Sequence, residues 1–146
     1  MRRALLLAGC VLLAAACGGG GHRLSKEDYA KRADTVCTRF SRQTKSLGGA
    51  TNLKQLARLA DKTLPLLDSA VADIRKLSPP KDEQETANRW LATLDRLRTD
   101  VVKIRERARA NDLAGVQAVL PAATRDDSES NRLAGQLGTK VCKRPS

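Results

Sequence analysis

The chain has 146 residues, a formal charge of +11 at neutral pH, and a single tyrosine, phenylalanine and tryptophan. This length supports one domain with a modest core, and the Ala- and Leu-rich, charged composition favours helices. The basic excess implies attraction to polyanions. Because no aromatic side chains alternate with the basic ones to stack bases, we expect no nucleic-acid partner.

The N-terminus has the layout of a cleaved export signal. Two arginines precede an apolar run over residues 4–16, which is shorter than the ~20 residues of a membrane-spanning helix. Ala14-Ala15-Ala16-Cys17 resembles the lipobox of bacterial lipoproteins, in which the cysteine is acylated and becomes the mature N-terminus. A second segment, Leu7-Ala8-Gly9-Cys10, matches the local motif better but leaves too short an apolar run. We therefore predict lipidation at Cys17.

This resemblance implies the domain organisation and the location of the protein. We expect a signal peptide over 1–16, a lipidated cysteine with a glycine-rich tether over 17–24, a helical domain over 25–142, and a frayed tail over 143–146. Removal of the signal lowers the formal charge from +11 to +9. The mature protein is then exported and attached to the membrane, on its outer face, by the lipid on Cys17.

Two cysteines remain after the signal and the lipid are accounted for. In an oxidising compartment, Cys37 and Cys142 are predicted to form a disulfide. The alternatives are two buried free thiols, or a zinc site. Two distant cysteines and the single His22 do not have the spacing of zinc ligands.

Apolar residues at spacings of three and four predict two helices in the first half of the domain. The first begins at Ser25, where Ser25-x-x-Asp28 resembles a capping box, and ends before Gly48-Gly49. The second runs from about 52 to 77. Pro65 lies inside it and predicts a kink near 61–65 or a break into two helices.

Two more helices are expected in the second half. After a Pro-Pro turn, the third runs from Lys81 to about Ala110, with Trp90 on its core face. The fourth starts at Asp112 and ends at Gly138, with a weaker pattern around Pro121 and the polar run 124–132. The sequence thus predicts an all-α fold, an antiparallel four-helix up-down-up-down bundle with kinks near Pro65 and Pro121.

The layout of the chain is similar to that of a broad group of small secreted or lipid-anchored actinobacterial proteins. The shared features are Tyr29-x-x-x-Ala33-Asp34-x-x-Cys37, a Pro-Pro turn before a long helix, and Leu137-Gly138-Thr139-Lys140-Val141-Cys142. The resemblance implies a helical fold tied by a disulfide. Members of the group are mostly of unassigned function, so it implies no particular activity.

No constellation of catalytic, cofactor-binding or metal-binding residues is found in the sequence. Asp126, Asp127 and Glu129 form the densest acidic group, but they lack the ligand spacing and central glycine of a calcium loop. Arg89, Arg96 and Lys103 recur every seven residues and form one column on a helix. This column is either a polyanion-binding surface or an ordinary solvated helix face.

Three functions are compatible with these features. The leading hypothesis is a non-catalytic, membrane-tethered binding module for an envelope protein or an anionic envelope polymer. The second is a carrier that holds a small apolar ligand between helices near Trp90 and predicts an interior cavity there. The third is an accessory or sensor subunit of an envelope complex.

Overall fold

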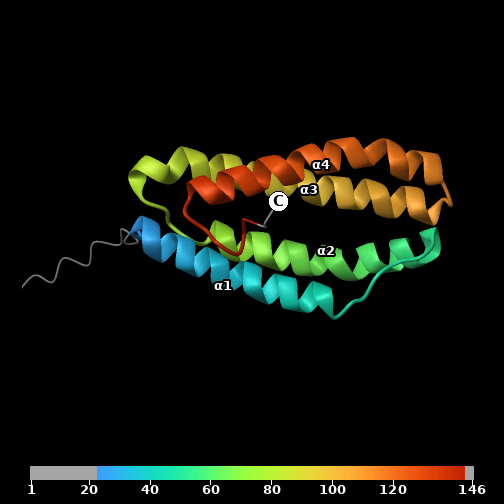
Figure 1. Cartoon of the computed structure of the whole chain (residues 1–146), viewed down its shortest axis with the longest axis horizontal. Helices are drawn as coiled ribbons and strands as arrows, with labels where there is room; N and C mark the ends of the chain where they lie inside the picture. The colour runs from blue at the N-terminus through green and yellow to red at the C-terminus, as the bar shows by residue number, and fades with distance from the viewer. Residues whose placement is uncertain (1–22, 144–146) are drawn as a thin grey trace, which may run out of the picture.

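The computed structural model describes residues 23–143, which form an all-helical domain. Its elements are α1 (Lys26–Lys45), α2 (Leu53–Arg75), a short 3-10 helix η1 (Lys81–Glu83), α3 (Gln84–Arg109) and α4 (Leu113–Gln136). The four long helices lie side by side along one direction (Figure 1). The predicted all-α fold is confirmed, and no strand occurs within 23–143.

Side-chain caps start three of the helices near the positions that the sequence indicates. The Ser25 hydroxyl accepts a hydrogen bond from the Asp28 N–H at 3.1 Å, at the start of α1. At the start of α2, the Asn52 side chain accepts from the Gln55 N–H at 2.9 Å. Each cap satisfies an amide that the first helical turn leaves without a partner.

The third helix begins differently from the prediction. We expected an α-helix from Lys81, but residues 81–83 form a 3-10 turn and α3 starts at Gln84. The Glu83 N–H donates to the Pro80 carbonyl oxygen at 3.1 Å, a bond that spans three residues. Bonds of this kind tighten a helix terminus that has no side-chain cap, and Glu83 provides none.

Both prolines lie inside continuous helices. α2 runs through Pro65 and α4 through Pro121, so the alternative of a helix broken at Pro65 is wrong. The polar run 124–132 is also helical. Two of its acids face basic partners on α3: Asp126 pairs with Arg96 at 2.9 Å, and Glu129 with Arg89 at 3.3 Å. Packing against α3 therefore compensates for the weak apolar pattern of this segment.

All four helices contribute to the main core, which lies where α1 and α3 begin and α2 and α4 end. We call this region the closed half. Tyr29, Trp90 and Leu133 are its largest members, each 1 % exposed. The other buried members are Ala33, Val36, Ala70, Ile74, Ala87, Ala134 and Leu137. A second, smaller cluster of Ala57, Ala108 and Val116 lies apart from it.

The C-terminal segment turns back onto α1 and is tied to it. Gly138 has a φ of +83°, a left-handed conformation that glycine adopts without a steric penalty, and the chain reverses there. Cys142 then forms a disulfide with Cys37, with a Cα–Cα distance of 5.3 Å. The predicted pairing is confirmed, and the free-thiol and zinc alternatives are wrong.

Candidate functional site

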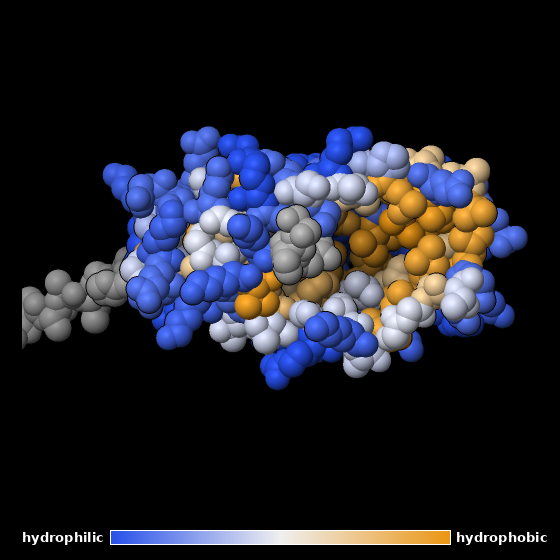
Figure 2. Space-filling model, in the orientation of Figure 1, coloured by the Kyte–Doolittle hydropathy of each residue, from blue (hydrophilic) through white to orange (hydrophobic). Residues whose placement is uncertain are grey.

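The candidate site is a groove of about 330 Å³ to which all four helices contribute, and which opens to solvent on the hollowed face seen in Figure 2. We call it the apolar groove. Most of its lining is hydrophobic: Phe40, Leu67, Ala70, Val71, Ile74, Trp90, Leu94, Leu97, Val101 and Val141. Figure 2 shows this face hollowed and largely hydrophobic over the half of the molecule away from the N-terminus.

The groove exists because α1 is too short to cover the full apolar stripes of α2 and α3. α1 has 20 residues, whereas α2 has 23 and α3 has 26. Figure 1 shows α1 and α4 diverging away from the end at which α1 begins. The apolar stripes of α2 and α3 continue beyond the closed half. Their residues there, Leu67 of α2 and Leu97 and Val101 of α3, are half-buried and line the groove.

Trp90 joins the closed half to the groove. Its ring is buried and lines the groove, and its indole Nε1–H donates to the Ser130 hydroxyl of α4 at 3.1 Å. The prediction that Trp90 is a core residue whose indole needs a partner is confirmed. The bond matters because an unpaired buried N–H costs about 1–3 kcal/mol.

One end of the groove is formed by the C-terminal segment and its disulfide. Cys37, Cys142 and Val141 all belong to the lining. The segment is also held by Asp34 on α1, whose carboxylate accepts hydrogen bonds from the backbone N–H groups of Lys140, Val141 and Cys142 at 2.8, 2.8 and 3.0 Å. Hydrogen bonds to a charged acceptor are stronger than neutral ones, so Asp34 supplements the covalent tie.

Asp34 is a structural residue to which the sequence analysis gave no role. Its only signal was its place in the segment Tyr29-x-x-x-Ala33-Asp34-x-x-Cys37, three residues before the bridged cysteine. A carboxylate three residues from Cys37 lies on the same side of α1, one turn away. It can therefore meet the segment that arrives with Cys142.

The polar part of the lining is small. Hydroxyl groups come from Ser41, Thr44, Thr63 and Ser130, and α4 adds Asp127 and Asn131, which are hydrogen-bonded to each other at 3.2 Å. Both cysteines of the lining are in the disulfide. The arrangement offers apolar surface with a few polar groups, which is the usual character of a small-molecule binding site.

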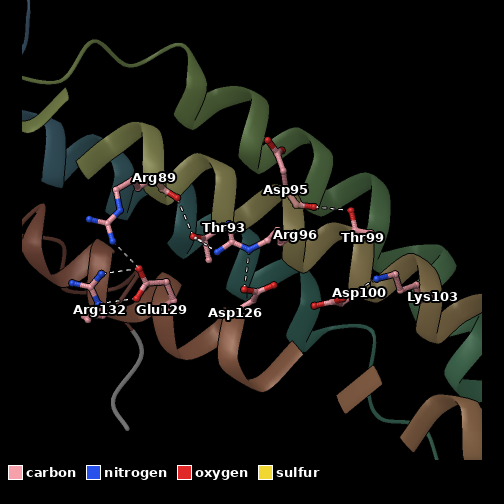
Figure 3. Close-up of polar contacts among 10 residues, drawn as sticks. All are labelled: Arg89, Thr93, Asp95, Arg96, Thr99, Asp100, Lys103, Asp126, Glu129 and Arg132. Carbon is pink, nitrogen blue, oxygen red and sulfur yellow. Dashed lines mark hydrogen bonds and ion pairs between the residues drawn. The ribbon is translucent and has the colours of Figure 1, made fainter. Parts of the chain in front are cut away.

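The predicted basic column lies elsewhere, along α3 where it faces α4 (Figure 3). Each of its members has an acidic neighbour: Arg89 pairs with Glu129, Arg96 with Asp126, and Lys103 lies 3.8 Å from the Asp100 carboxylate. Hydrogen bonding from Arg132, together with Arg132 and Arg89 as neighbouring cations, lowers the pKa of Glu129 below its ordinary value. The charge of the column is thus compensated locally, and polyanion binding by it stays a prediction.

Several other predictions concern residues that the structure does not describe. The signal peptide, Cys10, Cys17 and His22 lie outside 23–143. Within 23–143, no helix combines the length and hydrophobicity of a membrane span. No cluster of three or more His, Cys, Asp or Glu side chains in that part of the chain could hold a metal.

No protein-family model, curated protein sequence or solved structure matches this chain. The resemblances stated from the sequence therefore stay predictions.

Proposed function

We propose that the protein is a lipid-anchored, extracytoplasmic, non-catalytic carrier that holds a small apolar ligand in the apolar groove. The groove itself is the observation that supports this proposal. A volume of about 330 Å³ with a mainly hydrophobic lining lies at the lower end of the range of ligand pockets. The groove lies beside Trp90, where the carrier hypothesis expects an interior cavity, but it opens to solvent and is not enclosed.

The energetics of the groove favour an occupant. Each Å² of apolar surface removed from water contributes about 25 cal/mol, and Leu67, Leu97 and Val101 are only half-buried. The end wall is fixed by the Cys37–Cys142 disulfide. A wall that is already ordered does not lose conformational entropy when a ligand binds, which improves affinity.

A neutral fluorescent probe, N-phenyl-1-naphthylamine, tests this function. The full chain carrying Cys17→Ser provides a form without lipid, and Trp90 is its single tryptophan. We expect probe emission to rise and Trp90 emission to fall on binding. Leu97→Gln should weaken binding about tenfold, a loss of 1.4 kcal/mol. The matched control, Leu120→Gln, changes a leucine that is 47 % exposed and outside the lining, and should leave binding unchanged. Equal binding by both variants, or none by the parent chain, would reject the carrier function.

The lipid anchor is tested in cells. Cys17→Ala should release the protein from membranes, whereas Cys10→Ala should not. The opposite result would move the processing site to Cys10. Fractionation with detection of the protein in membrane and soluble pools measures both variants.

The topology proposed with this function is an antiparallel up-down-up-down bundle. Short connections join successive helices, and packing occurs between α1 and α2, α2 and α3, and α3 and α4. A short helix–helix connection favours antiparallel neighbours. The kinks expected near Pro65 and Pro121 belong to the same proposal, since a kink would widen the space between helices.

The second candidate is a binding module for an anionic envelope polymer or an envelope protein, or an accessory subunit of an envelope complex. The formal charge of +11, or +9 after removal of the signal, favours an acidic partner. Salt-sensitive retention of the protein on wall preparations, and crosslinking to an envelope protein in cells, are its tests. Absence of both would leave the carrier function alone.

A further inference from the structure

The positive charge of the described domain is distributed unevenly between its helices. On α3, Arg89, Arg96, Arg98 and Arg109 all form ion pairs with carboxylates. On the first half of α2, Lys54, Arg58 and Lys62 are exposed. No ion pair or side-chain hydrogen bond involves these three within residues 23–143. We call them the α2 stripe.

The spacing of the α2 stripe places its three cations together. Residues four apart lie one above another on a helix surface, so Lys54, Arg58 and Lys62 form one row. The core face of α2 carries Ala57, Ala60 and Leu64, which are buried. The row therefore points away from the core, into solvent.

The nearest acid on α2 does not neutralise this row. Asp61 lies close to Arg58 and Lys62 in the sequence, but its carboxylate forms ion pairs with arginines of α3. Arg109 lies 2.6 Å from Asp61 Oδ1, and Arg105 lies 3.9 Å from the same atom. Asp61 thus faces two arginines of α3, and the stripe keeps its full charge.

The neighbouring helix, α1, also carries exposed positive charges. Lys31 and Arg42 of α1 and Lys140 of the C-terminal segment line a shallow surface depression, together with the exposed acid Glu27. Asp34, which also lines it, is engaged by three backbone N–H groups. α1 and α2 lie next to each other along one side of the domain (Figure 1). Both helices therefore carry exposed cations.

We propose that the α1–α2 side, with the α2 stripe as its main contact, docks on the anionic phospholipid headgroups of a membrane surface. Charge complementarity supports this partner, since each Lys or Arg near an anionic surface contributes about 1 kcal/mol. The position of the chain supports it too. If Cys17 carries lipid, the six residues 17–22 allow a span of at most about 20 Å, and the described domain begins at residue 23, three residues before α1.

Docking of this kind would add a second attachment to the surface that holds the lipid. The tether joins the domain at the start of α1, whereas the α2 stripe begins at the other end of the molecule, where α2 starts (Figure 1). Contact at both ends would lay the long axis of the domain along the membrane. The inference uses the predicted lipid anchor only for proximity and does not depend on a ligand in the apolar groove.

The test compares two variants that each lose three positive charges. Lys54→Gln/Arg58→Gln/Lys62→Gln removes the α2 stripe, and Arg89→Gln/Arg96→Gln/Lys103→Gln removes the paired column on α3. Both are made in the full chain carrying Cys17→Ser. Glutamine is a good helix former, so α2 should keep its structure, which circular dichroism and thermal unfolding check. Binding is measured by cosedimentation with phosphatidylglycerol/phosphatidylcholine vesicles at low and high salt, and pure phosphatidylcholine vesicles measure binding by the apolar N-terminus.

We expect the α2 variant to lose at least tenfold in affinity for the anionic vesicles, and the α3 variant to lose less than threefold. Equal losses would mean that net charge alone governs binding, and would overturn the proposal. So would unchanged binding of the α2 variant, or retention of the parent chain by an acidic wall polymer without retention by vesicles. Probe binding in the apolar groove should be the same in both variants, so a failure here is distinct from a failure of the carrier function.

Discussion

The two halves of the domain are built from the same helices but reach different degrees of burial. In the closed half, Tyr29, Leu133 and Leu137 are each 1 % exposed. Toward the other end, Leu113 and Leu120 of α4 are 56 % and 47 % exposed, and the apolar groove lies between the two regions. The difference comes from coverage, because α1 ends before it reaches the end of the domain at which α4 begins (Figure 1).

Folding stability and ligand binding depend on different parts of the domain. Residues of the closed half have neighbours on every side, so their truncation leaves a cavity. The half-buried residues of the groove, such as Leu67 and Leu97, and the exposed part of α4 have solvent on one side, so truncation there costs less folding free energy. We therefore expect stability to depend mainly on the closed half, and ligand binding on the groove.

The largest effect is expected from removing the disulfide that seals the closed half. The bond joins residues separated by 105 positions, and closing a loop of this size stabilises by up to ~4.7 kcal/mol in the chain-entropy model. Cys37→Ser should lower the free energy of unfolding in urea substantially and leave Cys142 open to alkylation. Labelling of Cys142 in the non-reduced parent chain, measured by mass spectrometry of its peptide, would contradict the bridge.

Two leucines of α4 test the difference between the halves directly. Leu133→Ala should lower the free energy of unfolding by about 2–5 kcal/mol, because its side chain is buried in the closed half. Leu120→Ala, at 47 % exposure, should change it by about 0.5 kcal/mol or less. Urea unfolding of the two variants provides the comparison. Similar losses would show that the halves do not differ in packing.

Tyr29 makes the closed half sensitive to high pH. Burial raises the pKa of Tyr29 from 10.0 to about 12, because the buried site disfavours the phenolate. The unfolded chain therefore releases this proton first as the pH rises, and about 2–3 kcal/mol of stability, fully present below pH 10, is lost between about pH 10 and 12. Tyr29→Phe should lack this contribution to the pH dependence. The measurement is the difference in unfolding free energy between parent and variant from pH 8 to 12, and a constant difference would disprove it.

The smallest effect is expected at the noncovalent tie of the C-terminal segment. Asp34→Asn keeps the shape of the side chain but removes the charge that accepts three backbone hydrogen bonds, and should cost about 1.5 kcal/mol. Amide exchange of Lys140, Val141 and Cys142 should accelerate, while amides at the centre of α3 stay protected. Unchanged exchange at the three amides would remove Asp34 from this role.

The helical fold could be predicted because its signals are local. Ser25 and Asn52 cap helices, Gly138 ends one, and apolar residues recur at spacings of three and four. The disulfide followed from counting cysteines in a chain that the sequence predicts to be exported. The continuity of α2 through Pro65 was open, because a proline removes one helix bond but packing against other helices offsets that loss.

The groove, and which cations lack an acidic partner, could not be predicted from such local signals. Arg89, Arg96 and Lys103 form a regular column, yet the structure places each beside a carboxylate from α4 or from α3 itself. Lys54, Arg58 and Lys62 follow an equally simple spacing and keep their charge. Sequence spacing shows which residues share a face, but the acids opposite them come from other helices.

Local sequence thus decided the helices, their caps and the cysteines that could pair, because these depend on neighbours within a few positions or on the residue inventory. Tertiary structure decided how far α1 covers its neighbours, which carboxylates neutralise which cations, and that Asp34 holds the C-terminal segment. These features depend on distances between residues far apart in the chain. They produce the apolar groove and the α2 stripe, on which both functional proposals rest.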